Sequence, residues 1–419
     1  MMKKGDKQMD RFTGVLGLIA ILGVAFLFSE NKKKINWRLI ITGLVLQVLF
    51  ALFVLKTSIG QEIFNGFNGV IMKLLSFTSE GTNFLFGPLS DGSGAIPAGS
   101  VFVFNVLPTM IFFSSLMSIL YHLGIMQIII KVISKGLAKI LGTSGAETLS
   151  AVGNIFLGQT EAPLLIKPYI AKMTRSELLA IMVGGMATVA GGVMAGYVAM
   201  GVNAGDLLAG SIMAAPAGLL LAKILIPETE VPETQSGTEV KLESTSSSVI
   251  EAAANGASEG LGMALNVAAM LLAFIALIAL LNSLLGWVGG IFGMDYLSLY
   301  WVLGKLFAPV AWLMGVPAQD INTAGSLLGQ KIAINEFVAY SELGVNIANH
   351  TLQPKTIMIL SYALCGFANF TSIAIQIAGI GGIAPERKGT IAKLGFKALL
   401  GGALATFMTA TIAGILFSA

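Results

Sequence analysis

The sequence predicts an all-α integral membrane protein, with eight transmembrane helices, two opposed re-entrant hairpins and interfacial helices arranged as an inverted repeat. Of its 419 residues, 55% are hydrophobic and only 11% are charged, and the mean hydropathy is +0.83. Apolar runs of about 20 residues, the length that spans a bilayer as a helix, recur along the chain. Polar stretches and broken apolar segments follow one another in the same order in both halves.

Composition also limits the class of function. The net charge of +3 is small and dispersed, so nucleic acid is not an expected partner. The single cysteine, Cys365, lies in an apolar stretch and excludes an internal disulfide or a cysteine metal cage. The two histidines, His122 and His350, lack the spacing of a zinc site. Neither histidine lies in the polar motifs described below, so we do not expect an enzyme.

The first apolar run, residues 12–29, follows a basic segment and could suggest a signal peptide. It is too long for the apolar region of such a peptide, and the charged residues 30–34 follow it without a small-residue cleavage site. We therefore expect a retained first helix.

The other spanning helices are predicted from apolar runs of sufficient length. The full set is 12–29, 37–56, 99–121, 177–201, 204–226, 261–289, 355–381 and 391–418. Three amphipathic stretches are expected to lie in the membrane interface, namely 58–77, 123–141 and 295–314. Two stretches, 145–171 and 320–345, are too polar or too broken to span, and each is long enough for a re-entrant hairpin.

These elements divide the chain into four parts. They are an N-terminal scaffold at 1–141, a first repeat at 142–226, a cytoplasmic linker at 227–250 and a second repeat at 251–419. Residues 227–248 contain few apolar and no aromatic side chains, so a mobile loop is expected there. After each hairpin comes an apolar segment interrupted by glycine and small polar residues, 184–192 and 366–372. Such paired broken segments are typical of a secondary transporter.

Lysine and arginine set the expected orientation, because cytoplasmic loops carry the excess of these residues. With residues 30–36 inside, most basic residues fall at the inner boundary, although the basic N-terminal segment falls outside. Both chain ends are then external. The first hairpin enters from inside and the second from outside, so their tips should meet near the bilayer centre.

The first hairpin carries a polar motif, Gln159-Thr160-Glu161, within an apolar protein. A carboxylate at membrane depth is expensive and usually marks a substrate or ion pathway. The Gln159 amide and the Thr160 hydroxyl can match the edge of a heterocycle. Pro163 lacks a backbone N–H and favours a break in the helix. A purely structural role, as hydrogen bonds between helices, remains the alternative.

The next apolar segment contains four glycines between Gly184 and Gly192. Each glycine costs a helix about 1 kcal/mol relative to alanine, so this density indicates unwinding or very close packing. Unwound carbonyls and the Thr188 hydroxyl are oxygen ligands that suit a small cation. A packing face of small residues is the alternative.

The second half places Asn335 and Glu336 in the outer hairpin. Asn369 and Ser372 are three residues apart and share one helical face, with Phe367 beside them as an aromatic wall. A carboxylate and an amide suit a vicinal diol, because each hydroxyl can donate and accept. Hydrogen bonds to a charged group contribute about 1.5–3 kcal/mol each.

These motifs together resemble those of the concentrative nucleoside transporters, in their bacterial sodium-coupled form. The residues that carry the resemblance are GQTEAPL at 158–164, the glycine-rich segment after it, NEFVAY at 335–340 and CGFANFTSIAI at 365–375. The resemblance extends over nearly the whole chain. It implies a homotrimer in the lipid of the bacterial cytoplasmic membrane, in which each protomer imports a nucleoside by moving a transport domain past a scaffold, an elevator mechanism.

The resemblance also implies roles for particular residues. Gln159, Thr160 and Glu161 would face the nucleobase, Glu336, Asn369 and Ser372 would hold the ribose with Phe367 nearby, and Val193 and Met263 would contact the base. Substrates would be of the uridine, cytidine or adenosine type, with purine and pyrimidine preference left open. Sodium would be the coupling ion, with no other cofactor, and its ligands would be Asn154, Thr188 and the carbonyls of Leu157 and Val189.

One departure bears on the ion. Sodium-coupled members of this family often have serine where this chain has Thr188, although threonine keeps the hydroxyl. A proton-coupled symporter of the same fold, with Glu161 or Glu336 as the proton carrier, is the alternative. A channel is disfavoured, because two half-depth hairpins with single acidic residues do not make a ring of charge.

Overall fold

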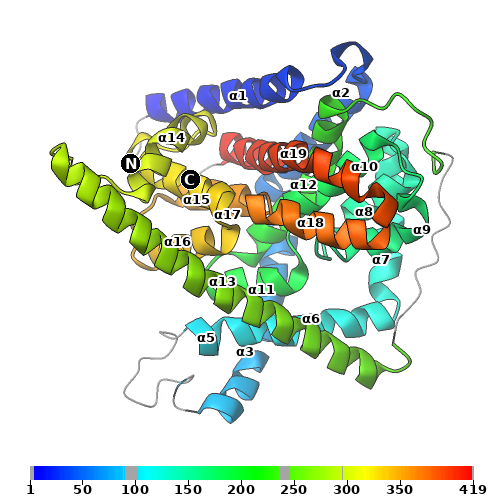
Figure 1. Ribbon diagram of the computed structural model, residues 1–419, viewed down its shortest axis with the longest axis horizontal. Coiled ribbons are helices and arrows are strands. Elements are labelled where there is room, and N and C mark those ends of the chain that lie inside the picture. Colours follow the sequence, from blue (N-terminus) through cyan, green and yellow to red (C-terminus); the bar gives the residue numbers. More distant parts are fainter. Residues whose placement is uncertain (1–3, 88, 90–101, 236–245, 295, 418–419) are drawn as a thin grey trace.

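The computed structural model describes residues 4–87, 89, 102–235, 246–294 and 296–417, and the regular structure among these residues is entirely helical (Figure 1). The all-α prediction is confirmed. In the view of Figure 1, α1 (Lys4–Leu27) runs along one side, α19 (Lys388–Leu416) lies near the centre and the long α13 (Val249–Ile291) crosses diagonally.

Six helical stretches among the described residues are long and apolar enough to cross a membrane. They are Trp37–Lys56, Val103–His122, Arg175–Ala199, Ala204–Leu225, Val249–Ile291 and Pro385–Leu416. Each overlaps one of the eight predicted spans. The predicted span 12–29 corresponds to a shorter apolar helix, Phe12–Leu27, and the span 355–381 is divided between two short helices.

The last helix forms the centre of the packing. α19 packs against α1, α10 (Arg175–Ala187), α12 (Ala204–Leu225) and α17 (Pro354–Leu364). α12 also packs on α2 (Trp37–Lys56), and the side chains of α12 are almost all buried. α10, α12 and α19 are therefore surrounded by protein, which removes the need for one polar face and one apolar face on each helix.

The long helix α13 differs from its predicted bounds, because it begins twelve residues before the expected start at 261. The added turns are rich in small residues, and they pack on α6 (Leu107–His122). A Cβ on Gly256 would lie 2.6 Å from the Ser114 carbonyl oxygen, and one on Gly260 would lie 2.7 Å from the Ile111 Cα. Small residues thus let the two helices approach closely, a packing mode that apolar run length does not detect.

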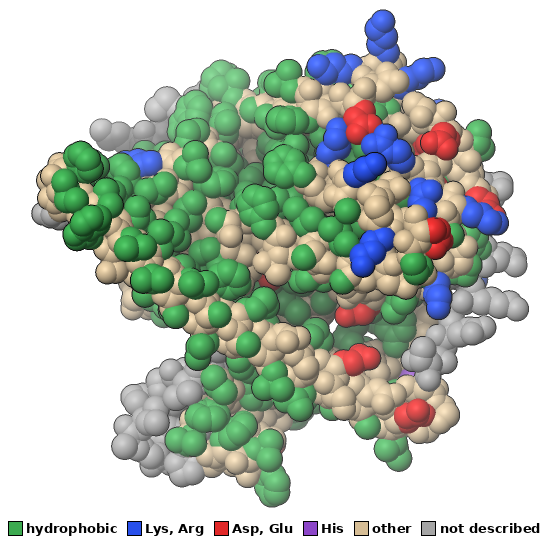
Figure 2. All heavy atoms as spheres, viewed as in Figure 1, with side chains coloured by type: hydrophobic (Ala, Val, Ile, Leu, Met, Phe, Trp, Pro, Cys, Tyr) green, Lys and Arg blue, Asp and Glu red, His purple; other side chains and the backbone are tan. Residues whose placement is uncertain are grey.

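Beyond this contact α13 faces outward with large apolar side chains. Leu265, Leu272, Leu280 and Trp287 are exposed on it. Hydrophobic side chains also cover much of the face in Figure 2, whereas lysine and arginine gather at one end, around the α1–α2 connection and the start of α19. An apolar girdle with a basic end is the surface of a multi-pass membrane protein.

The three stretches expected in the membrane interface are helical. They are α3 (Ser58–Phe86), α7 (Ile125–Leu141) and α14 (Leu299–Leu313). α3 continues nine residues beyond its expected end at 77. The remaining short elements in this part are η1 (Lys32–Lys34) and α5 (Phe102–Asn105).

Both polar stretches consist of short helices joined by turns. The first contains α8 (Gly145–Gly153), η2 (Ala162–Ile166) and α9 (Lys167–Ile170). The second contains η3 (Ala318–Asp320), α15 (Ile321–Ala333) and α16 (Glu336–Ala348). Ser144 and Glu147 form a capping box that begins α8, and Asn335 caps α16 by accepting a hydrogen bond of 2.9 Å from the Val338 N–H.

Each polar stretch is followed by a broken helix. α10 ends at Ala187, and α11 (Gly191–Ala199) begins after an extended link. α17 ends at Leu364, and α18 (Phe370–Ile383) begins after Asn369, with η4 (Pro385–Arg387) leading into α19. The predicted interruption is thus present in both segments.

The linker differs in part from the prediction of a mobile loop, since residues 227–235 are fixed on the helical body. Thr234 accepts hydrogen bonds from the Gly145 N–H on its carbonyl and from the Ala146 N–H on its hydroxyl, at 3.0 and 3.1 Å. Lys223 pairs with Glu147 at 2.7 Å and Glu228 at 3.1 Å. Residues 236–245 of the predicted loop lie outside the described residues, and α13 begins at Val249, one residue before the predicted end of the linker at 250.

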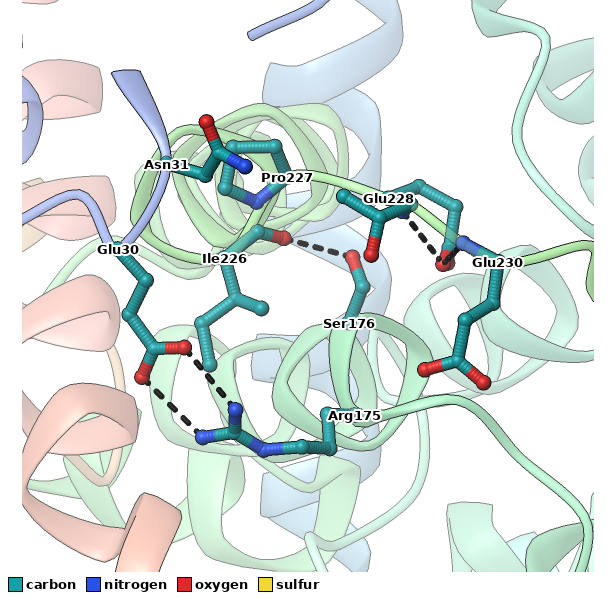
Figure 3. Close-up of a pocket in the computed structure, with 9 residues that line it drawn as sticks. Glu30, Asn31, Arg175, Ser176, Ile226, Pro227, Glu228 and Glu230 are labelled. Carbon is teal, nitrogen blue, oxygen red and sulfur yellow. Dashed lines mark hydrogen bonds and ion pairs between the residues drawn. The ribbon is translucent and has the colours of Figure 1, made fainter. Parts of the chain in front are cut away.

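The ordered linker closes a polar pocket of about 220 Å³ (Figure 3). Arg175 of α10 forms two hydrogen bonds to Glu30, and the Ser176 hydroxyl donates to the Ile226 carbonyl at 2.7 Å. The link between α1 and α2, the start of α10 and the end of α12 are therefore tied together at this end.

Candidate functional site

A chain of hydrogen bonds joins the two halves of the molecule. Gln159 donates from Nε2 to the Ser372 hydroxyl at 3.1 Å. Asn369 accepts from the Ser372 N–H at 2.9 Å and donates from Nδ2 to Glu336 Oε2 at 2.9 Å. The Tyr197 hydroxyl donates to Glu336 Oε1 at 3.1 Å. Four of the predicted substrate residues thus lie in one connected cluster.

Broken helices explain why these polar side chains converge. Asn369 is the cap of α18, so its side chain turns toward the first N–H groups of that helix. Glu336 is the first residue of α16, where the partial positive charge of a helix N-terminus favours a carboxylate. The turn after α8 brings Gln159 against α10, since a Cβ on Gly185 would lie 2.8 Å from the Gln159 Cβ.

The acceptor side of Gln159 remains available for a ligand. Its Oε1 atom is buried and has no hydrogen-bond partner among the described residues, although Nε2 is bonded to Ser372. Buried polar atoms are nearly always hydrogen-bonded, so an orphan oxygen beside this cluster points to a missing donor.

Thr160 and Glu161 lie differently from Gln159. Thr160 packs on α18, where a Cβ on Gly379 would come within 2.5 Å of its methyl carbon. The Glu161 carboxylate turns back to accept a hydrogen bond from the Gly158 N–H, and the residue is exposed. Figure 2 shows a hollow with acidic side chains at its edge below the centre of the molecule. The structure does not join Glu161 to the Glu336 cluster.

The three predicted apolar contacts come from three elements. Val193 is buried on α11, and Phe367 is half-buried in the link between α17 and α18. Met263 is half-buried on α13, where its methyl group lies 3.8 Å from the position of a Cβ on Gly192. Met263 therefore lies beside Gly192, the residue before Val193 on α11.

The two broken helices meet at their breaks. Gly366 has a φ of +136°, a region that favours glycine, and a Cβ there would lie 2.8 Å from the Met186 carbonyl oxygen. The end of α10 and the link after α17 are thus in backbone contact. This contact places the Thr188 region beside the segment that carries Phe367 and Asn369.

The four predicted sodium ligands lie on two segments that touch each other. Asn154 caps the end of α8, and Thr188 follows the end of α10. The Asn154 amide nitrogen lies 3.5 Å from the position of a Cβ on Gly184. The Phe156 carbonyl accepts a hydrogen bond of 3.0 Å from the Gly191 N–H, so the turn with Leu157 faces the link with Val189.

Hydrogen bonding leaves oxygen lone pairs free at this place. Asn154 Nδ2 donates to the Ser150 carbonyl at 2.9 Å, while its Oδ1 atom is buried without a partner among the described residues. The Thr188 hydroxyl donates its proton to the Gly184 carbonyl at 2.9 Å. The Thr188 proton and the Asn154 amide nitrogen are thus already hydrogen-bonded to carbonyls. The oxygen lone pairs of both side chains can therefore bind a hard monovalent cation. In the described part of the chain, no group of three His, Cys, Asp or Glu side chains could hold a metal.

Sequence reasoning missed two buried polar side chains near this site. Tyr197 is wholly buried on α11, stacks on Tyr340 and bonds Glu336. Gln376 of α18 donates to the Met182 carbonyl at 2.9 Å and ties α18 to α10. A lone tyrosine in a helix of small residues was the available signal for Tyr197. Gln376 sits in an apolar run and gave none beyond its own polarity.

Three family models together match most of the chain. The model described as "Na+ dependent nucleoside transporter N-terminus" matches residues 16–89, "Nucleoside recognition" matches 103–204, and "Na+ dependent nucleoside transporter C-terminus" matches 206–414. The boundary between the last two falls in the first turn of α12.

Similar proteins cover the same length. An uncharacterized transporter of Bacillus subtilis, YutK, is 50% identical over 97% of this chain and 100% of its own. The nucleoside permease NupC of Helicobacter pylori is 46% identical over 96% of both chains. The structure of CNTnw in an inward-facing substrate-bound state is similar with a TM-score of 0.90 and 45% identity, covering 97% of both chains.

Proposed function

The chain belongs to the family of Na+-dependent nucleoside transporters, and we propose that it imports nucleosides across the bacterial cytoplasmic membrane as a symporter driven by the sodium gradient. It is a multi-pass membrane transporter and not an enzyme. The observation that carries the sodium proposal is the Asn154 Oδ1 atom at the end of α8, which is buried and has no hydrogen-bond partner among the described residues. α8 packs against α10, and Thr188 caps the end of α10.

Helix ends favour a cation at this position. Carbonyl groups at the C-terminal end of a helix carry partial negative charge, and α8 and α10 both end here. Asn154 and Thr188 supply side-chain oxygens, and Leu157 and Val189 supply carbonyls. None of these ligands brings a formal charge, so a monovalent ion adds one positive charge to the loaded protein.

For the nucleoside we propose that the ribose hydroxyls bind Glu336, Asn369 and Ser372. Both Glu336 oxygens accept one hydrogen bond from a neutral donor and retain a lone pair for a diol. We propose that Gln159, with Thr160 and Glu161, reads the base through its Oε1 atom, which has no hydrogen-bond partner among the described residues. Phe367, Val193 and Met263 form the apolar walls. Uridine, cytidine and adenosine are the substrates we expect.

We further propose that transport moves the site as one body within each protomer of a homotrimer in lipid. The moving body carries the binding residues of the first repeat, 142–226, and of the second repeat, 251–419. The scaffold comprises residues 1–141 together with α13, which packs closely on α6. The exposed apolar surface of α13 supports contact with lipid or with neighbouring protomers. The basic end in Figure 2 supports a cytoplasmic location for residues 30–36 and for the linker 227–250.

One observation favours proton coupling as the second candidate. Glu336 is 4% exposed, and its hydrogen-bond partners, Tyr197 and Asn369, are both neutral. A buried carboxyl group among neutral partners can take up a proton, so a proton could travel in place of sodium.

Uptake measurements distinguish the two ions. An uncharged nucleoside is concentrated by the membrane potential only if a cation travels with it, and one charge crossing 100 mV supplies about 2.3 kcal/mol. With external sodium, we expect labelled uridine to accumulate in proteoliposomes above its external concentration. When choline replaces sodium, the internal uridine concentration should rise no higher than the external one. Uptake that ignores sodium and follows an imposed inward proton gradient would select the proton-coupled alternative.

A further inference from the structure

Lys331 is a buried cation that the proposed transport cycle does not yet use. It lies in the last turn of α15 and is completely buried, with an exposed fraction of 0%. Its ammonium donates to the Ala363 carbonyl at 2.6 Å and to the Thr406 hydroxyl at 2.8 Å, and it lies 5.8 Å from the centroid of the Phe407 ring. Among the described residues, no carboxylate forms an ion pair with it. A buried charge without a charged partner is expensive and calls for a function.

The ammonium sits where two helices end. α15 ends at Ala333 and α17 at Leu364, and the Ala363 carbonyl belongs to the last turn of α17. The partial negative charges of two helix C-termini therefore face one positive charge. The Thr406 hydroxyl from α19 adds a side-chain oxygen, and it donates its own proton to the Ala403 carbonyl at 3.0 Å.

The first half of the chain repeats this construction around the proposed ion site. There the first helix of the polar stretch, α8, and the first part of the broken helix, α10, end side by side. Asn154 precedes Gln159 by five residues, and Lys331 precedes Glu336 by five residues. Each half also has a threonine hydroxyl that donates its proton to a helix carbonyl: Thr188 at the end of α10 in the first half, and Thr406 of α19 in the second.

From this correspondence we propose that the Lys331 ammonium is a built-in cation. In the second half it lies at the helix ends that correspond to those where the coupling ion would bind in the first half. This comparison rests on the proposed sodium site. The first half gains its cation from solution and loses it in every cycle. The second half carries its cation covalently, so it needs no second ion.

The fixed charge makes Lys331 a positioning residue for the nucleoside. Its bond to the Ala363 carbonyl holds the last turn before the link that carries Phe367 and Asn369. Glu336 follows it on the same polar stretch, so the positive charge also favours the ionised carboxylate that would bind the ribose. Substrate affinity should therefore depend on a positive charge at this position, whichever molecule supplies it.

The test uses two variants of the purified full-length transporter and a matched control. Lys331→Met removes the charge and fills the space, Lys331→Ala removes the charge and leaves a cavity, and Lys305→Met changes an exposed lysine of α14 that bonds Asn322. Uridine binding is measured by titration calorimetry at saturating sodium, and thermal unfolding reports folding. Methylammonium, and methanol as its neutral counterpart, are then added to each variant.

We expect Lys331→Met and Lys331→Ala to bind uridine at least about tenfold more weakly, because each loses hydrogen bonds to a charged group. Methylammonium should restore binding to Lys331→Ala but not to Lys331→Met, whose cavity is filled. Lys305→Met should bind as the wild type does.

Three results would overturn the proposal. They are wild-type affinity in Lys331→Met, equal rescue of Lys331→Ala by methanol, and unfolding of both variants without recovery in methylammonium, which would make Lys331 a structural anchor only. None of these measurements uses an ion gradient. Failure of sodium coupling would instead appear as sodium-independent uptake by the wild-type protein, and the two failures are distinguishable.

Discussion

Glu336 carries the strongest residue-level expectation. Both of its oxygens are bonded within the cluster, and a ribose diol would add bonds to a charged acceptor. Glu336→Gln should reduce uridine affinity by about ten- to a hundredfold, the equivalent of one charged hydrogen bond. The loss should be smaller for 2′-deoxyuridine and 3′-deoxyuridine, each relative to its own wild-type value.

The control for this prediction is Tyr197→Phe, which removes one neutral donor to Glu336 and keeps the carboxylate. It should weaken uridine binding less than Glu336→Gln does. Equal fractional losses for uridine and both deoxynucleosides would assign Glu336 a structural role.

The ion ligands form the second prediction at this scale. Asn154→Ala combined with Thr188→Val removes two side-chain oxygens without changing the charge of the protein. The sodium concentration for half-maximal uptake should rise at least about tenfold, because each lost ligand leaves the ion less solvated. Thr188→Ser keeps the hydroxyl and should behave as the wild type. An unchanged sodium dependence of uptake in the double variant would show that sodium does not bind to Asn154 and Thr188.

Individual residues also show where sequence reasoning succeeds and where it stops. Glu336 and Gln159 stand out because a polar side chain in an apolar chain is costly, and the structure places both in the cluster. The partnership of Tyr197 with Glu336 joins residues 139 positions apart. The pattern of neighbouring residues carries no information on a contact over this distance along the chain, so the contact could not be predicted from the sequence.

At the scale of elements, the breaks in α10–α11 and α17–α18 were predicted because glycine and small polar residues interrupt apolar runs. None of the four glycines lies in the break itself. Gly184 and Gly185 are helical in α10 and allow close packing, Gly191 and Gly192 begin α11, and the chain unwinds at residues 188–190. The early start of α13 and the ordered linker depend on tertiary contacts with α6 and α8, which override local composition.

The contact between the two breaks yields the third prediction. Gly366→Ala would place a methyl group within 2.8 Å of the Met186 carbonyl oxygen and in a backbone region unfavourable for alanine. We expect a loss of about 1–3 kcal/mol in stability and weaker uridine binding. Thermal unfolding and calorimetry measure the two effects.

A matched glycine is available for comparison. Gly382 lies in the last turns of α18, and a Cβ there meets no atom within 4 Å. Gly382→Ala should leave both stability and binding near their wild-type values. If Gly366→Ala were equally silent, the two breaks would not be held against each other.

At the scale of the whole molecule, one carboxylate connects several elements at the basic end. Glu30 pairs with Arg175 of α10 at 3.1 Å and with Lys397 of α19 at 3.2 Å. Burial alone would raise the pKa of Glu30, but hydrogen bonds from Lys397 and Arg175 hold the pKa below its ordinary value. The folded protein therefore binds the proton of Glu30 less readily than the unfolded chain does.

This shift fixes the sign of a pH effect. Because the pKa is lowered on folding, the contribution of Glu30 to stability is complete at neutral pH and is lost as the pH falls through the lowered pKa. Glu30→Gln should reduce stability by about 0.5–1 kcal/mol near pH 7, as for a partly exposed ion pair. The difference from the wild type should vanish in acid. A pH-independent difference in melting temperature would contradict this assignment.

The backbone contact at Gly366 has a consequence for how strictly the transport of the ion is coupled to that of the nucleoside. A leak requires that ion and nucleoside cross separately, so that one part of the binding region shifts while the other stays. Main-chain atoms at the end of α10, beside Thr188, touch the link that carries Asn369. The two segments should therefore move together. The proposed transporter should therefore return either empty or fully loaded, and the gradient should be spent only when cargo is carried.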